Sequence, residues 1–169
     1  MIPSEKKWLV FYTKSRQEKK TQELLRRNGF EVYLPLQKVM RQWSDRKKKV
    51  EVPLFNSYIF VQENESRIPL ILQTPGVAWN IRFNDKPAVL QASELETIER
   101  FITSGYHLES KQVDNLEAGD SVEVIDGPLK GMLGYLTKTT EGDKFTVWLE
   151  SIGQTMVTRI DPSILRKRL

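Results

Sequence analysis

The stretch LFNSYIFVQ, residues 54–62, is the most hydrophobic strand signal in the chain, and it decides the fold of the N-terminal part. Alternation along a strand would divide its side chains into two opposite faces: Phe55, Ser57, Ile59 and Val61 on one, and Leu54, Asn56, Tyr58 and Phe60 on the other. Both faces carry large apolar groups. Two explanations stay open: a strand covered on both sides, or an open apolar depression that receives the helix tip of a partner.

The segments around this strand alternate between strand and helix signals. Strands are predicted over 7–13, 30–40 and 77–83, and a short helix over 66–73. Ser15 with Glu18, and Ser93 with Glu96, have the spacing of a capping box, so each pair predicts a helix start. The first helix should end at Asn28-Gly29. We therefore predict an α+β fold, with an N-terminal α/β sandwich on an antiparallel sheet over residues 1–105.

The pattern changes after residue 105. Residues 106–117 are polar and predict a linker. Short strands are predicted over 120–125, 132–138, 144–150 and 154–160, with glycine-rich turns between them, so 118–169 should form a small all-β barrel. Glycine, proline and β-branched residues are spread through this part, which favours strands over an α-helical hairpin.

Composition excludes several classes of protein. The 169 residues include no Cys and a single His, His107, which removes disulfides, thiolate chemistry and multi-His metal clusters. The sequence has no P-loop, nucleophile elbow or GxGxxG motif, so we expect neither an enzyme nor a cofactor or metal site. It has no apolar run of the roughly 20 residues that a membrane span needs, and no signal peptide pattern. We therefore expect a cytoplasmic protein that binds no membrane.

Positive charge is concentrated near the N-terminus. Residues 6–49 contain fourteen basic and four acidic groups, which suggests a face for a polyanion or, alternatively, a solvated surface. Helical spacing would place Arg16, Lys20 and Arg27 on one face, with Lys14 just before the helix and Gln17 in its first turn. Such a ridge suits phosphates and a base edge, but Glu23 on the same face could instead pair with these cations.

A second basic feature is RQWSDRKKK, residues 41–49, predicted as the polar tip of a hairpin. A basic loop with an embedded aromatic residue can stack on bases or lie beside a phosphate backbone. The alternative is a mobile loop with Trp43 folded back on the sheet.

These segments, in this order, resemble a known family. WLVFY (8–12), the basic helix, YLP (33–35), PLFNSYIFV (53–61), TPGV (74–77) and Arg82-Phe83 resemble the NGN domain of the NusG family. DSVEVIDGPLKGMLG, residues 120–134, resembles a KOW motif. The NGN-like details are most similar to specialised antiterminators of the RfaH and UpxY type.

The resemblance implies a monomeric transcription elongation or antitermination factor. It implies that the clamp helices of RNA polymerase are bound through Tyr12, Phe55, Asn56, Tyr58 and Phe60. It further implies contact with the non-template DNA strand through Lys14, Arg16, Gln17, Lys20 and Arg27. The KOW barrel of the family recruits a ribosomal protein of the small subunit or the termination factor Rho. Here the matching loop includes Ile152 and Gln154 and has no aromatic residue, which argues against Rho. The alternative function is a KOW-bearing RNA- or ribosome-binding protein.

Overall fold

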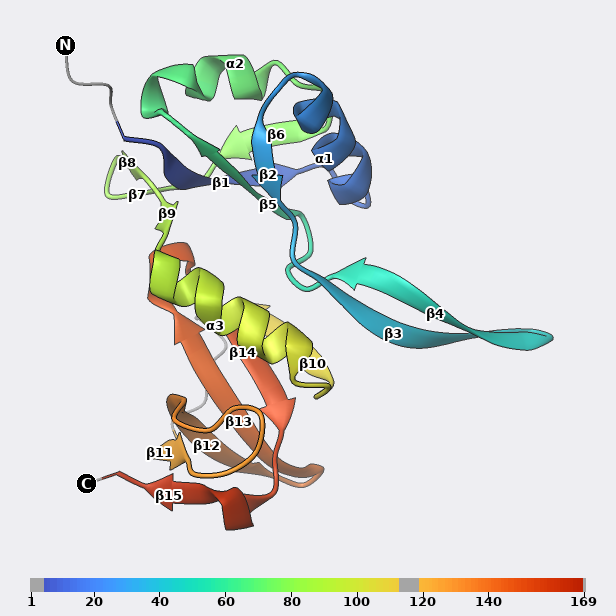
Figure 1. The fold of residues 1–169 in the computed structure, drawn as a ribbon, viewed down its shortest axis with the longest axis vertical. Helices are drawn as coiled ribbons and strands as arrows, with labels where there is room; N and C mark the ends of the chain where they lie inside the picture. The colour runs from blue at the N-terminus through green and yellow to red at the C-terminus, as the bar shows by residue number, and fades with distance from the viewer. Residues whose placement is uncertain (1–4, 113–118, 169) are drawn as a thin grey trace. The chain divides into compact units, whose positions relative to one another are not determined.

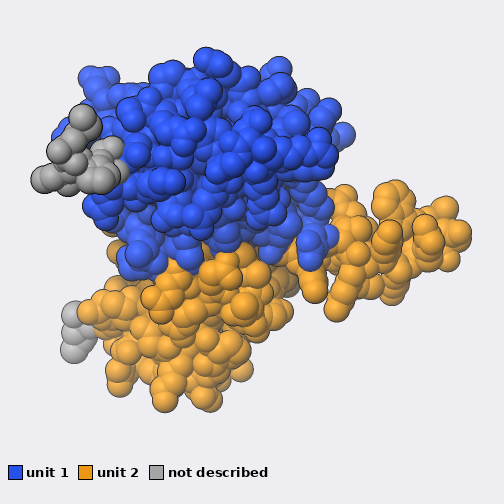
Figure 2. All heavy atoms as spheres, turned by 45° about the horizontal axis from the view of Figure 1, so that its top comes forward, with its two compact units in different colours: residues 1–36, 51–95 blue, residues 37–50, 96–169 orange. Residues whose placement is uncertain are grey.

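The computed structural model describes residues 5–112 and 119–168, with the side chains of 111 and 112 left undescribed. The chain forms two compact units, which are coloured separately in Figure 2. The first unit consists of Met1–Leu36 and Glu51–Leu95, and the second of Gln37–Val50 and Glu96–Leu169. Among the described residues, no helix has the length and apolar character needed to cross a bilayer.

The first unit is built on an antiparallel sheet in the order β2-β5-β1-β6, with β9 also paired to β1 (Figure 1). Its strands and helices are β1 (Lys7–Thr13), α1 (Glu18–Arg27), β2 (Glu31–Tyr33), β5 (Tyr58–Glu63), the 3₁₀ turn η1 (Glu65–Arg67), α2 (Ile68–Leu72), β6 (Val77–Asn80), β7 (Arg82–Phe83), β8 (Lys86–Pro87) and β9 (Val89–Leu90). The two helices cover one face of the sheet (Figure 1). The core on that face consists of Leu9, Phe11, Leu25, Phe30, Val32, Ile59, Val61, Ile68, Ile71 and Val77.

The first helix differs from its predicted start. α1 begins at Glu18, its N-cap is Gln17, and no side chain caps it, so the capping box predicted for Ser15 and Glu18 is wrong. Arg16 has a φ of 61°, which takes the chain out of the helical path just before α1. The helix ends as predicted, with Asn28 as C-cap and Gly29 at a φ of 84°.

The second strand predicted over 30–40 is divided in two. β2 ends at Tyr33, and β3 (Leu36–Trp43) begins after Pro35 and pairs only with β4 (Arg46–Pro53) in a two-stranded ribbon. The basic segment 41–49, predicted as a loop, is therefore mostly strand, with a turn only at 44–45. Likewise, the strand predicted over 77–83 ends at Asn80, and Arg82 starts the separate small hairpin of β7 and β8.

The third helix, α3 (Ala92–Thr103), starts one residue before the predicted cap at Ser93. The carboxylate of Glu94 accepts the backbone N–H of Gln91 at 3.0 Å, so the reciprocal bond expected of Glu96 is made by Glu94 two positions earlier. Ile98 and Phe101 on its apolar face are fully buried, and the ring of Phe101 stacks on Phe145 with centroids 6.3 Å apart.

The second unit contains a six-stranded antiparallel sheet in the order β10-β14-β13-β12-β11-β15. Its elements are β10 (Leu108–Gln112), β11 (Asp120–Val124), β12 (Leu133–Thr139), β13 (Gly142–Leu149), η3 (Glu150–Ile152), β14 (Gln154–Arg159), η4 (Pro162–Ile164) and β15 (Leu165–Lys167). The all-β architecture predicted for this part, and its four predicted strands, are confirmed. β10 and β15 were not predicted; β10 lies in the segment expected to be a linker, of which residues 113–117 fall outside the described residues.

Two glycines allow close approaches of the chain in this sheet, one within a strand and one in a loop. A Cβ at Gly134 would lie 2.7 Å from the ring of Phe145, so β12 can approach β13 only with glycine here. Gly131 has a φ of 88° and its N–H bonds to the carbonyl of Val124 at 2.7 Å, which closes the loop after β11. Arg100 of α3 donates to the carbonyls of Pro128 and Lys130 in that loop at 3.2 and 2.8 Å.

Candidate functional site

A continuous series of aromatic rings lies on the face of the N-terminal sheet opposite its two helices. Neighbouring ring centroids are 4.6 to 6.5 Å apart. We call this set the aromatic series, and its members in order of contact are Trp8, Tyr33, Phe60, Phe55, Tyr58, Tyr12 and Trp79. Cross-strand pairing produces it, because Tyr12 lies opposite Tyr58 on one side and Trp79 on the other, and Tyr33 lies opposite Phe60.

The predicted polymerase-binding residues are brought together in this series, with one exception. Tyr12, Phe55, Tyr58 and Phe60 contact one another through their rings, whereas Asn56 lies in the turn before β5 and is exposed. The alternation predicted that Phe55 lies in a strand, and this is wrong. β5 begins only at Tyr58, and Ser57 before it has a φ of 66°. The ring of Phe55 nevertheless meets Phe60 at 6.5 Å.

Burial varies along the series. Phe55, Tyr58 and Phe60 are buried, Tyr12 is half-buried, and Trp79 is 55% exposed. Trp79 stacks on Tyr12 with centroids 4.6 Å apart and planes 5° apart. The accessible end of the series is therefore the Tyr12–Trp79 pair. Sequence reasoning missed Trp79, although its position two residues after Val77 in a predicted strand was a usable signal.

The turn before β5 is held by α1. The buried carboxylate of Glu18 accepts the backbone N–H of Ser57 at 3.0 Å, and Ser57 in turn accepts the N–H of Thr13 at 2.8 Å through its carbonyl. These bonds fix Asn56 at the surface between the end of β1 and the start of α1. The turn and the N-terminus of the first helix therefore form one local structure.

The five predicted DNA-binding residues, namely Lys14, Arg16, Gln17, Lys20 and Arg27, are all exposed. The single helical face predicted for Arg16, Lys20 and Arg27 is not formed by all three, because Arg16 precedes the helix and Gln17 is its N-cap. Lys14 is held at the start of this segment by a bond from its backbone N–H to the carbonyl of Gly76 at 2.9 Å. Arg27 forms an ion pair with Glu23 at 2.6 Å, as the alternative reading of this face expected.

The two residues of the predicted KOW contact, Ile152 and Gln154, are both buried, with 1% and 5% exposure. Ile152 ends η3, and Gly153 turns the chain into β14 with a φ of 67°. The exposed apolar side chains of this sheet lie elsewhere, at Leu133, Tyr135 and Trp148, and the last two rings are 5.6 Å apart. A shallow depression of about 170 Å³ adjoins them.

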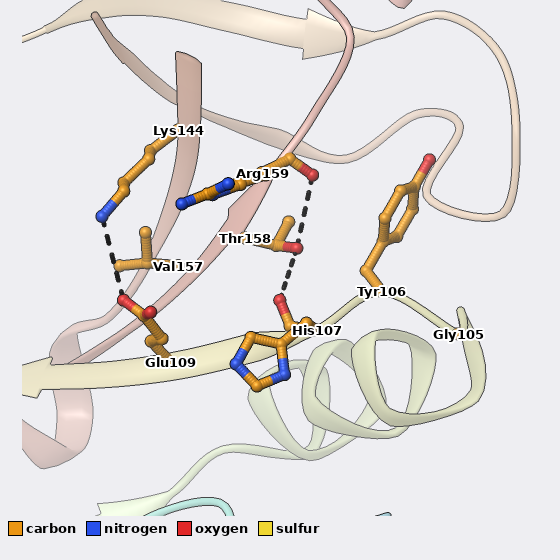
Figure 3. Close-up of a pocket in the computed structure, with 8 residues that line it drawn as sticks. All are labelled: Gly105, Tyr106, His107, Glu109, Lys144, Val157, Thr158 and Arg159. Atoms are coloured by element: carbon orange, nitrogen blue, oxygen red, sulfur yellow. Dashed lines mark hydrogen bonds and ion pairs between the residues drawn. The ribbon is translucent and has the colours of Figure 1, made fainter. Parts of the chain in front are cut away.

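A pocket of about 270 Å³ lies between β10, β13 and β14 in the second unit (Figure 3). Its cations are already paired: Lys144 lies 3.9 Å from Glu109 and from Glu141, and Arg159 lies 3.5 Å from Glu141. The hydroxyl of Thr158 donates to the carbonyl of His107 at 2.8 Å, as Figure 3 shows. The described residues contain no group of three potential metal ligands here or elsewhere.

Comparison with known proteins places this chain in a family. The family model described as transcription termination factor nusG matches residues 6–99, more than half of the chain. No curated protein matches.

Among solved structures, one of Thermotoga maritima NusG, described as showing domain interaction, is similar in fold. Its TM-score is 0.59 at 21% identity, over 97% of this chain and 98% of that one. A structure of the MjSpt4:Spt5 complex matches 94% of this chain and 95% of that one at 16% identity, with a TM-score of 0.33. By the match of the family model, the chain belongs to the NusG family of transcription factors.

Proposed function

We propose that this protein is a transcription elongation and antitermination factor of the RfaH and UpxY type, which binds the clamp helices of RNA polymerase. The observation that carries the proposal is the aromatic series with its accessible end at Tyr12 and Trp79. Interface hot spots are enriched in Trp and Tyr that sit beside well-packed apolar groups. Here the exposed stack continues into the buried rings of Tyr58 and Phe55.

If the partner binds at the Tyr12–Trp79 end, the buried rings of the aromatic series do not touch it and only hold the contacting rings in place. Phe55 and Phe60 are too deeply buried to be the first groups that a partner meets. Asn56, in the turn before β5, and Trp79, in β6, are both exposed on segments that flank β1, and they are the residues that we assign to direct contact. This assignment refines the set Tyr12, Phe55, Asn56, Tyr58 and Phe60 that the family resemblance implies.

The mechanism requires no chemical step by the factor. A protein that binds the elongating state of polymerase more tightly than the paused state shifts the equilibrium toward elongation. Its effect on pausing cannot exceed its difference in affinity for the two states. Contact of Lys14, Arg16, Gln17 and Lys20 with the non-template DNA strand would add to that difference. All four side chains are exposed, so the three cations are available for phosphates and the neutral amide of Gln17 for a hydrogen bond to a base edge.

We assign to the six-stranded sheet of the second unit the recruitment of a further partner, and the candidate that the resemblance implies is a ribosomal protein of the small subunit. The buried positions of Ile152 and Gln154 argue that such a partner contacts their neighbours rather than these side chains. Leu133, Tyr135 and Trp148 are large apolar side chains exposed on the six-stranded sheet of this unit and are available for such a contact. The cytoplasm is the expected location of a factor with these partners.

Binding to purified RNA polymerase tests the central proposal. We expect Trp79→Ala and Tyr12→Ala to weaken polymerase binding by about 30-fold, the effect of losing a hot spot of about 2 kcal/mol. Trp148→Ala, at a tryptophan that is 39% exposed on the other unit, is the control and should leave this affinity unchanged. Wild-type affinity in a folded Trp79→Ala, Tyr12→Ala double variant would refute the proposal.

A second experiment distinguishes the proposed function from the alternative, an RNA- or ribosome-binding protein. An RNA- or ribosome-binding protein would bind structured RNA in the absence of polymerase and would not change the read-through of a terminator. The proposed factor should increase read-through in a purified transcription reaction, and the Trp79→Ala variant should lose that effect.

A further inference from the structure

The outer half of the β3–β4 ribbon is an exposed cationic surface that the proposed polymerase and DNA contacts do not use. Every residue from 40 to 49 is exposed. The ribbon has one acidic residue near its tip, Asp45, and six basic ones: Lys38, Arg41, Arg46, Lys47, Lys48 and Lys49. None of these six forms an ion pair or a side-chain hydrogen bond within the described part of the chain. Their charge is therefore available to a partner.

An aromatic ring lies among these charges. Trp43 is 53% exposed at the end of β3. It is therefore not folded back on the sheet, which was one of the two alternatives that the sequence left open. Strand alternation places Trp43 and Arg41 on the same face of the ribbon, about 7 Å apart. The strands are joined by a turn of two residues, so Trp43 faces Arg46 and Arg41 faces Lys48 across the ribbon. One face thus presents an indole ring with three cations around it.

The root of the ribbon is fixed, in contrast to its outer half. The side-chain amide of Gln37 donates to the carbonyl of Leu108 at 3.0 Å and accepts its N–H at 3.4 Å. The N–H of Leu54, just after the ribbon, bonds to the carbonyl of Pro35 at 2.9 Å, just before it. The half-buried residues Val39 and Val50 lie nearer the root. The ribbon is therefore an arm of two paired strands, held at its root and exposed at its tip, rather than a loop.

We propose that this face of the ribbon binds single-stranded nucleic acid, with one base stacked on Trp43 and phosphates bound by Arg41, Arg46 and Lys48. The charge of the ribbon is complementary to a phosphodiester chain. The indole of Trp43, 53% exposed, provides the kind of stacking platform that single-strand binding proteins use. A base paired inside a duplex cannot stack on a side chain, so we commit to an unpaired strand. This binding requires no polymerase and is independent of the proposed function.

Fluorescence anisotropy of labelled oligonucleotides with the full-length protein tests the inference. The probes are a DNA single strand, an RNA single strand of the same sequence, and the corresponding duplex, each measured at several salt concentrations. We expect both single strands to bind more tightly than the duplex. Stronger binding of RNA would identify an unpaired transcript as the natural source of the strand, and stronger binding of DNA would identify the unpaired non-template strand.

Variants separate stacking from charge. Trp43→Ala should weaken single-strand binding by about fivefold or more, whereas Trp43→Phe should retain most of it, since a phenyl ring can still stack. Replacing Arg41 and Lys48 by Gln should lower the dependence of log affinity on log salt by about 0.7 per lost contact. Lys86→Gln and Lys138→Gln, at exposed lysines outside the ribbon, are the matched charge controls and should change neither quantity.

The inference is overturned if Trp43→Ala and the Arg41→Gln, Lys48→Gln variant bind single strands as the wild type does. Tighter binding of the duplex, or loss of binding in the lysine controls to the same extent, would overturn it as well. Because Trp43 is exposed at the tip of the ribbon, its replacement should leave the melting temperature unchanged. Because the polymerase contact is assigned to the Tyr12–Trp79 end of the aromatic series, Trp43→Ala should bind polymerase as the wild type does, so this measurement separates the further inference from the proposed function.

Discussion

The carboxylate oxygen Oε1 of Glu18 lies 3.0 Å from the backbone nitrogen of Ser57 and accepts its N–H. The first residue of α1 thereby fixes the left-handed turn that precedes β5. Glu18 is 7% exposed, so the bond is formed largely away from water. Its position at the N-terminus of the helix also suits its negative charge.

Removal of this acceptor should destabilise the first unit. We expect Glu18→Ala to lower the free energy of unfolding by about 1–3 kcal/mol, because the N–H of Ser57 is left without its acceptor. Urea unfolding followed by tryptophan fluorescence measures the change. Glu23→Ala on the same helix removes an exposed ion pair with Arg27 and should change stability by less than about 1 kcal/mol. Equal effects of the two substitutions would contradict the structural role of Glu18.

Phe55 and Asn56 are neighbours with opposite expected behaviour. Phe55→Ala should lower stability by about 3–5 kcal/mol, because its buried ring packs against Phe60 and Tyr58. Asn56→Ala, at an exposed position, should stay within about 0.5 kcal/mol of the wild type. Thermal unfolding of both variants distinguishes these cases. Polymerase binding lost in a fully stable Phe55→Ala would show that the ring is a contact residue after all.

The basic residues around α1 should contribute unequally to DNA binding. On paused elongation complexes, Arg16→Ala and Lys20→Ala should each lower the salt dependence of affinity by about 0.7, the value for one phosphate contact with a single strand. Arg27→Ala should change it less, because Arg27 is already paired with Glu23. An identical decrease for all three would mean that the Arg27–Glu23 pair opens on binding.

Gly134 and Gly131 test the packing of the second unit. Gly134→Ala should lower stability by about 1–3 kcal/mol, because the added methyl group would lie 2.7 Å from the ring of Phe145. Gly131→Ala meets no atom within 4 Å, and only its φ of 88° opposes the substitution. Gly131→Ala should therefore lower the free energy of unfolding by about 1 kcal/mol. Calorimetry of the two variants should therefore rank Gly134→Ala as the less stable.

Asp161 provides a small dependence of stability on pH. Its carboxylate caps η4 by accepting the N–H of Ser163 at 2.9 Å, and this hydrogen bond lowers the pKa of Asp161 below its ordinary value. A pKa that is lower in the folded state means that the stabilisation is present above the unfolded pKa. It is lost as the pH falls through the folded pKa. Titration of the carboxyl carbon by NMR should show the lowered pKa, and an ordinary pKa would indicate that the cap is open in solution.

Patterns that depend on near neighbours were readable in the sequence. Alternation and turn residues predicted β1 and the strands β11 to β14, and Asn28-Gly29 predicted the end of α1, because strand faces and helix ends are set by local chemistry. The family resemblance over the NGN-like part agrees with the family model, which matches residues 6–99.

The site itself depended on contacts between distant segments. Ser15 and Glu18 had the spacing of a cap, but the carboxylate is better used by Ser57, 39 positions away, and no local rule can weigh that bond. The stack of Trp79 on Tyr12 and the strand β10 opposite β14 likewise arise from pairing between remote strands. The sequence by itself determined the type of most elements, since propensity and alternation act over a few residues. Only the tertiary structure decided which rings meet, which charges are already paired and which stay exposed, because each of these depends on what the folded chain brings alongside.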